Sequence, residues 1–186
     1  MMSIAYDYTH DVEPLRPAPP RKLLLIDGRR VESVSGRSFE TLNPATEQVI
    51  ATVAEGCEAD VDLAVAAARS AFEGPWRRIR AAERGQILFR LAALMKQHEA
   101  ELAELESCDA GKPIAAVLRQ DLPAAIDTLL YYAGWADKIS GEVISTRDDA
   151  LTYTVREPVG VVGVIVPWNF PPVSYTHLTL PTNREV

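Results

Sequence analysis

With 186 residues the chain is long enough for about one domain, and its 47% hydrophobic and 24% charged residues are typical of a soluble globular protein. A formal net charge of −7 at pH 7 argues against nucleic acid and against an anionic membrane as partners, because both are polyanions. The two cysteines, Cys57 and Cys108, have neither Cys-x-x-Cys nor zinc-ligand spacing, which predicts no metal site and indicates a reducing, cytoplasmic location.

The first twenty residues, 1–20, are rich in proline and predict a disordered lead-in. They contain no basic, apolar leader of the kind that signal or transit peptides carry. The longest apolar run of the chain is too short to cross a bilayer, so no membrane span is expected.

Short strands separated by turn residues come next. The first two, over 23–26 and 30–34, form a predicted hairpin around the Asp-Gly turn that begins at Asp27. Two more strands, over 38–42 and 48–53, are joined by a predicted Asn-Pro-Ala-Thr turn.

The apolar residues then recur with helical spacing. One helix is predicted to end near Gly74, and its apolar face consists of Val61, Val65, Ala68 and Phe72. A second helix is predicted over 81–98, and it continues or restarts until Gly111 ends it. Its inward-facing residues are expected to be Ile87, Leu88, Leu91, Leu94 and Met95.

A short helical turn over 114–118 is predicted to precede a long helix over 122–140. We expect Asp121 to be the N-cap of this helix and Gly141 to follow its end. Alternating side chains then return and predict a hairpin over 142–156.

A continuous apolar run, 159–166, ends at the sequence Pro-Trp-Asn-Phe-Pro. Its valines and isoleucines predict a strand buried on both faces, as in a parallel sheet. Ligands bind beyond the carboxyl ends of such strands, where Asn169 would stand on a loop whose backbone is restricted by two prolines. One parallel strand cannot bury both its faces alone, so the pattern predicts an incomplete α/β domain.

Several segments together resemble the N-terminal part of the NAD(P)-dependent aldehyde dehydrogenases: ETLNPATEQVIATV, ADVDLAVAAARSAF, PWRR, LLYYAGWADK and YTVREPVGVVGVIVPWNFP. The resemblance extends over about 23–171 and implies an α/β fold, an incomplete Rossmann-like cofactor domain with an oligomerisation hairpin. It divides the chain into a lead-in (1–20), part of the cofactor domain (21–141), the oligomerisation hairpin (142–156), the first buried strand with its PWNFP loop (157–172) and a tail (173–186). The tail is unlike the family, lacks helical periodicity and is expected to be non-native.

The resemblance also implies roles for five consecutive residues. Asn169 matches the family asparagine whose side-chain amide donates a hydrogen bond to the oxyanion of a cysteine thiohemiacetal, a contribution of roughly 3–4 kcal/mol. Ile165, Val166, Pro167 and Trp168 match the loop that lies against the nicotinamide cofactor, NAD or NADP.

The implied reaction is oxidation of an aldehyde substrate to a carboxylic acid, in an enzyme that assembles into dimers or tetramers. In the family the nucleophilic cysteine and the general-base glutamate follow the PWNFP loop, so the 186-residue chain by itself is expected to be inactive. The alternative is a non-catalytic interaction module that pairs with full-length subunits through the hairpin over 142–156.

The remaining candidate residues are interpreted as structural. Cys57 begins a helix beside two acidic residues and has no histidine near it in sequence, so no catalytic thiolate is expected. Cys108 is interpreted as a packing residue and His98 as a capping or surface residue.

Lys112 follows a glycine but lacks the pattern of a phosphate-binding loop, which favours a helix-stop motif. Three nearby carboxylates are expected to form a solvated helix face and not a catalytic pair: Glu101, Glu104 and Glu106.

Overall fold

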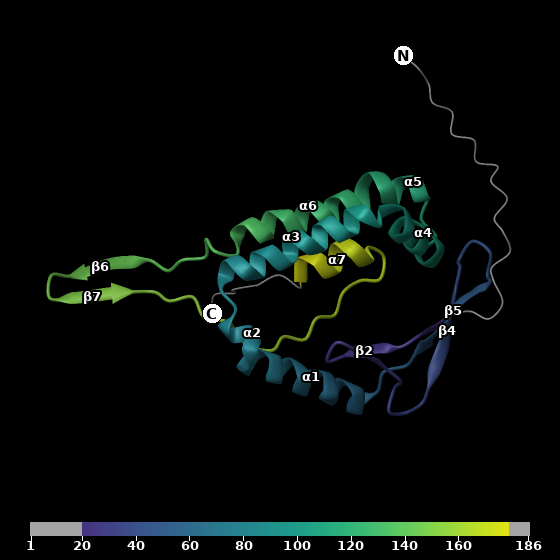
Figure 1. Cartoon of the computed structure of the whole chain (residues 1–186), viewed down its shortest axis with the longest axis horizontal. Helices are drawn as coiled ribbons and strands as arrows, with labels where there is room; N and C mark the ends of the chain where they lie inside the picture. Colours follow the sequence, from purple (N-terminus) through teal and green to yellow (C-terminus); the bar gives the residue numbers. More distant parts are fainter. Residues whose placement is uncertain (1–19, 179–186) are drawn as a thin grey trace, which may run out of the picture.

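The computed structural model describes residues 20–178, with the side chains of 175–178 left out, so nearly all of the predicted lead-in and the end of the predicted tail lie outside the described residues. Strands and helices both occur in this range (Figure 1). In chain order they are β1 (Arg21–Lys22), β2 (Leu24–Ile26), β3 (Arg29–Val31), β4 (Ser38–Leu42), β5 (Val49–Ala54), α1 (Glu58–Glu73), α2 (Pro75–Arg78), α3 (Ala81–Gln97), α4 (Glu99–Ala110), α5 (Ile114–Ala116), η1 (Val117–Asp121), α6 (Leu122–Trp135), β6 (Val143–Arg147), β7 (Ala150–Tyr153) and α7 (Pro171–Leu178).

The predicted strands of the first part are confirmed. β2 and β3 form an antiparallel hairpin, and the positive φ of Asp27 (52°) and Gly28 (71°) suits the two-residue turn between them. β5 lies between β1, which is parallel to it, and β4, which is antiparallel. The turn between β4 and β5 is held by Asn43, whose Oδ1 accepts a hydrogen bond from the N–H of Ala45 at 2.8 Å.

The core lies where α3 and α6 pack against each other (Figure 1). Ala92 of α3 and Ile126 and Leu129 of α6 form one buried cluster. The helices approach closely at Gly85, where a Cβ would stand 2.7 Å from the carbonyl oxygen of Ala133. A second cluster joins α4 to the turn before α6, through Ala103, Val117 and Leu122.

The predicted helices form, but the long one is shorter than expected and starts differently. α6 ends at Trp135, well before Gly141. Asp121 was expected to be its N-cap, and this is wrong, because Asp121 has helical dihedral angles (φ −71°, ψ −52°) and makes no capping hydrogen bond. A π-helical turn, η1, runs into α6 without a break, so the backbone amides there need no side-chain cap. The carboxylate of Asp121 instead accepts a hydrogen bond from Lys112.

The burial expected along the second helix is only partly found. Ile87, Leu88 and Met95 are half-buried, whereas Leu91 and Leu94 are exposed. α1 is also exposed at Val61 and Val65. The apolar spacing therefore predicted the helices correctly, but it did not predict which of their apolar residues are buried in the described part of the chain.

The predicted buried strand over 159–166 is not present. This segment belongs to a long extended stretch between β7 and α7 that pairs with no strand of residues 20–178 (Figure 1). Val159 is 61% exposed and Ile165 is fully exposed. A strand needs at least one hydrogen-bonding neighbour, and the described part of the chain places none beside this segment.

The first residues of the tail form part of a helix although their sequence lacks helical periodicity. α7 covers Pro171–Leu178 and packs against α6. Pro171 and Pro172 stand in the first turn of α7, where the missing N–H groups would have had no helical partner. The predicted hairpin over 142–156 is confirmed as β6 and β7, and it projects away from the helices (Figure 1).

Candidate functional site

The five residues predicted to act on substrate or cofactor lie together, at the end of the extended segment and on the loop that joins it to α7. Asn169 is exposed, two residues before the first residue of α7. The following residue, Phe170, accepts a hydrogen bond from the N–H of Ser174 at 2.9 Å and so begins the helix. This contact and the prolines at 167 and 171 limit the freedom of the short loop that carries Asn169.

An apolar surface precedes Asn169. Ile165 is fully exposed and Trp168 is 81% exposed, with half-buried Val166 and exposed Pro167 between them. These four residues can lie against one face of a flat ring. They form a single wall and not an enclosed cleft. That Ile165, Val166, Pro167 and Trp168 lie against the nicotinamide cofactor stays a prediction.

The loop is connected to the helices through Lys112. The ammonium Nζ of Lys112 stands 3.8 Å from the centroid of the Phe170 ring, which is a cation–π distance. The same Nζ donates hydrogen bonds to Glu106 Oε1 at 2.9 Å and to Asp121 Oδ2 at 2.5 Å. Two helical elements, α4 through Glu106 and η1 through Asp121, thus meet the loop at a single ammonium group.

The two carboxylates around Lys112 are buried. The Glu106 side chain is 3% exposed and that of Asp121 is 8% exposed. Burial raises the pKa of the Glu106 carboxyl, and the hydrogen bond from Lys112 opposes that shift only in part. Burial alone would lower the pKa of Lys112, but its hydrogen bonds to Asp121 and Glu106 outweigh burial and raise it. Lys112 therefore remains an ammonium ion in this cluster.

The structure corrects the prediction for Glu106 and confirms the one for the helix stop at Gly111. Glu106 is buried, so it does not belong to a solvated helix face. The helix-stop interpretation is confirmed, since Gly111 ends α4 with φ 70°. The contacts of Lys112 could not be predicted from the sequence. Its partners Glu106 and Asp121 lie six and nine residues away, outside the spacing of helical ion pairs.

The other candidate residues have structural surroundings. Cys57 is the first residue before α1, where its N–H donates to Asp60 Oδ2 at 2.9 Å. Asp60 also accepts from Ser33 Oγ at 2.7 Å and from the N–H of Val34 at 3.0 Å. These hydrogen bonds, with that of Ser33 the strongest, lower the pKa of the Asp60 carboxyl far below its usual range. Asp60 thus ties the β2–β3 hairpin to the start of α1.

His98 lies at the junction of α3 and α4, exposed, with Nδ1 3.1 Å from Glu101 Oε2. Cys108 is half-buried on α4 as a free thiol. Residues 20–178 contain no group of three or more His, Cys, Asp or Glu side chains placed to hold a metal ion. In the same range no helix combines the length and the apolar character that crossing a membrane requires.

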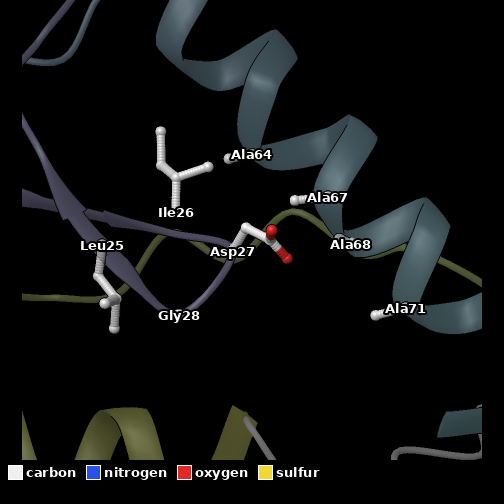
Figure 2. A pocket seen from close by; sticks show the side chains of 8 residues that line it. All are labelled: Leu25, Ile26, Asp27, Gly28, Ala64, Ala67, Ala68 and Ala71. Carbon is white, nitrogen blue, oxygen red and sulfur yellow. The ribbon is translucent and has the colours of Figure 1, made fainter. Parts of the chain in front are cut away.

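A hollow of about 350 Å³ lies between the β2–β3 turn and α1 (Figure 2). Its walls are mostly apolar: Leu25 and Ile26 on one side and Ala64, Ala68 and Ala71 on the other, with Asp27 at the turn. None of the five predicted site residues lines it. Its alanine-rich wall resembles a packing surface more than a binding site.

Comparison with known proteins places this site in context. The sequence model of the aldehyde dehydrogenase family matches residues 31–182, which include all five predicted site residues. An aldehyde dehydrogenase of Emericella nidulans is 51% identical over 148 residues, which are 80% of this chain and 30% of that protein. The putative aldehyde dehydrogenase DhaS of Bacillus subtilis is 50% identical over 151 residues, 81% of this chain and 30% of that protein.

Solved structures agree. The NAD+ complex of an aldehyde dehydrogenase from Bacillus cereus superposes with a TM-score of 0.82 at 49% identity, covering 84% of this chain and 32% of that one. The chain therefore spans about a third of the length of the relatives that it matches.

Proposed function

Since the chain belongs to the aldehyde dehydrogenase family, we propose that it forms the N-terminal third of an NAD(P)-dependent enzyme that oxidises an aldehyde to a carboxylic acid. The observation that carries the proposal is the match over residues 31–182, because it includes the PWNFP loop and its surroundings. The free thiols of Cys57 and Cys108 support a reducing, cytoplasmic location.

We assign Asn169 the role of oxyanion donor. Its amide is exposed at the end of an extended segment, on a loop limited by two prolines, so an N–H can point at an external oxygen without rearrangement of the backbone. A donor of this kind, aimed at the oxygen where negative charge develops, contributes roughly 3–4 kcal/mol to transition-state stabilisation. That contribution corresponds to a loss of about 10²–10³ in kcat when the donor is removed.

We assign Ile165, Val166, Pro167 and Trp168 to one wall of the cofactor site. Their exposed apolar surface fits the face of a nicotinamide ring, and the Bacillus cereus relative has been solved as an NAD+ complex. NAD+ or NADP+, when bound, accepts the hydride of the substrate. The contribution of this chain is to orient the ring and exclude water from one of its faces.

The β6–β7 hairpin is proposed as an oligomerisation element that joins subunits into dimers or tetramers. It projects from the body, and Val143 and Leu151 are each 76% exposed (Figure 1). A two-stranded ribbon with apolar side chains and open edges gains stability when other strands pair with it. The same hairpin supports the second candidate function, a non-catalytic module that pairs with full-length subunits.

Activity and association separate the two functions. In a complete enzyme that contains this chain, Asn169→Ala should lower kcat by about 10²–10³ with little change in the melting temperature. Asn169→Gln is the matched control: it keeps an amide but moves it, so kcat should fall as well if position matters. A kcat unchanged by both variants contradicts the oxyanion role.

The 186 residues by themselves should show no cofactor-dependent turnover of an aldehyde. If the purified chain instead co-elutes with a full-length subunit, and Leu151→Ser abolishes that co-elution, the interaction module is the better description. Turnover by the chain alone would contradict both proposals.

A further inference from the structure

We propose that Lys112 is a positioning residue, whose ammonium group, held between two buried carboxylates, fixes the Phe170 ring and through it the loop that presents Asn169. The catalytic consequence rests on the proposed role of Asn169 as oxyanion donor. The structural part, that the loop is held by Lys112, stands independently of that role.

The position of the Lys112 ammonium is determined by two carboxylates of the helical part of the chain. Glu106 comes from α4 and Asp121 from η1, so the two acceptors fix Nζ from two elements. The main chain of Lys112 is held too, since Ser107 Oγ donates to its carbonyl oxygen at 2.6 Å. Hydrogen bonds from an ammonium to carboxylates are stronger than those between neutral groups, which further disfavours departure of the lysine.

This anchor meets the loop at Phe170. Nζ lies 3.8 Å from the ring centroid, close enough for the positive charge to be attracted by the face of the ring. Ile165 is fully exposed and Trp168 is 81% exposed, so these two side chains contact little of the chain, whereas Val166 is half-buried. Phe170, at 42% exposure, is partly covered, and the ring therefore provides a side-chain anchor for the loop.

The effect reaches Asn169 through a single peptide bond. A Phe170 ring that leaves Lys112 must rotate its own backbone or side chain, and a backbone rotation there turns the neighbouring Asn169. An oxyanion donor displaced by about 1 Å loses much of its stabilisation of the transition state, because its hydrogen bond depends on distance and direction. We therefore expect the cluster of Glu106, Lys112 and Asp121 to influence kcat from outside the site.

The first experiment uses the 186-residue chain and measures the surroundings of Trp168 and the hydrogen exchange of Ser174. The chain has three tryptophans, so the indole N–H resonance of Trp168 can be assigned by Trp168→Phe, with Trp76 and Trp135 as internal references. Lys112→Met should shift the Trp168 resonance and leave that of Trp76 in place. It should also accelerate hydrogen exchange of the Ser174 amide, which donates to Phe170, by roughly tenfold.

Three further variants keep the test decisive if Lys112→Met folds poorly. Phe170→Leu retains an apolar side chain but removes the ring face, so it should reproduce both effects while the buried cluster stays intact. Lys112→Arg keeps the cation and should restore most of the wild-type signal. Lys96→Met removes a surface lysine paired with Glu99 at 2.7 Å and should change neither readout.

The second experiment measures kcat and KM in a complete enzyme that contains this chain. Lys112→Met and Phe170→Leu should each lower kcat by roughly tenfold, and the double variant should be no worse than the single ones. If Asn169→Ala leaves kcat unchanged while the Trp168 resonance still responds to Lys112→Met, the proposed oxyanion role of Asn169 fails and the positioning of the loop stands. If neither Lys112→Met nor Phe170→Leu alters the Trp168 resonance in a folded chain, the positioning proposal is overturned.

Discussion

The α3–α6 pair and the extended segment before α7 are similar in apolar content but opposite in burial. In the helix pair, Leu129 is fully buried against residues of the same chain, whereas Ile165 in the extended segment is fully exposed. A helix satisfies its backbone hydrogen bonds within itself and needs only one packed face. An extended segment needs neighbouring strands for its backbone and a layer on each face. The comparison shows that a short apolar run becomes a strand only where partners are available.

The largest expected effect tests the buried side of this comparison. Leu129→Ala should lower the free energy of unfolding by about 3 kcal/mol, because it leaves a cavity between α3 and α6. Its neighbour Leu130 is 40% exposed and provides the matched control, for which Leu130→Ala should cost clearly less. Urea unfolding measures both changes. Equal losses from the two variants would show that the helix pair is not packed as described.

On the exposed side, Ile165→Ala should change the free energy of unfolding by less than about 0.5 kcal/mol in this chain. A loss comparable to that of Leu129→Ala would mean that the segment is buried in solution, and the contrast between the two regions would disappear.

Close packing of the helices gives the next effect. Gly85→Ala would bring a Cβ to 2.7 Å from the carbonyl oxygen of Ala133, so we expect a loss of about 1–3 kcal/mol as the helices separate. Gly134→Ala is the control on α6, because a Cβ there meets no atom within 4 Å. That substitution should stabilise the helix by about 0.5–1 kcal/mol. Thermal unfolding should therefore shift in opposite directions, and a shared direction contradicts the packing.

Acid should weaken the connection between the first hairpin and α1. The pKa of Asp60 is lower in the folded chain than in the unfolded chain, so its contribution is present above the unfolded pKa of about 4 and is lost as the pH falls below it. Ser33→Ala removes the strongest of the hydrogen bonds that lower this pKa. Acid unfolding of the variant should depend less on pH below 4, and an identical pH profile would contradict the assignment.

An equally small effect on stability is expected in the β6–β7 hairpin. Leu151→Ser replaces a side chain that is 76% exposed, so the free energy of unfolding should change by less than about 0.5 kcal/mol. Self-association measured by analytical ultracentrifugation should nevertheless decrease, because the substitution removes apolar surface from the projecting ribbon. Unchanged association would argue against the hairpin as an interface.

Local rules in the sequence were sufficient for most elements. The Asp27-Gly28 turn, the Asn43 turn and the glycine that ends α4 were predicted correctly because each depends on residues within one turn of itself. The start of α6 was not, since a π-helical turn replaced the expected cap at Asp121.

Some residues of the candidate site could likewise be predicted from the sequence, and others could not. Asn169 and the apolar residues before it could be selected from sequence, because the PWNFP motif and its flanking segments resemble a known family. The partners of Lys112 could not be selected. Glu106 appeared to be one of several solvated carboxylates, and only the packing of α4 against η1 buried it.

The sequence by itself determined the family, the positions of helices and hairpins, and the residues of the PWNFP loop, because these depend on local chemistry and on the order of motifs along the chain. The tertiary structure decided which apolar faces are buried, that 159–166 is an exposed segment, and that Lys112 joins Phe170 to two buried carboxylates. Burial and ion pairing are properties of groups brought together from distant parts of the chain, and sequence spacing does not encode that proximity.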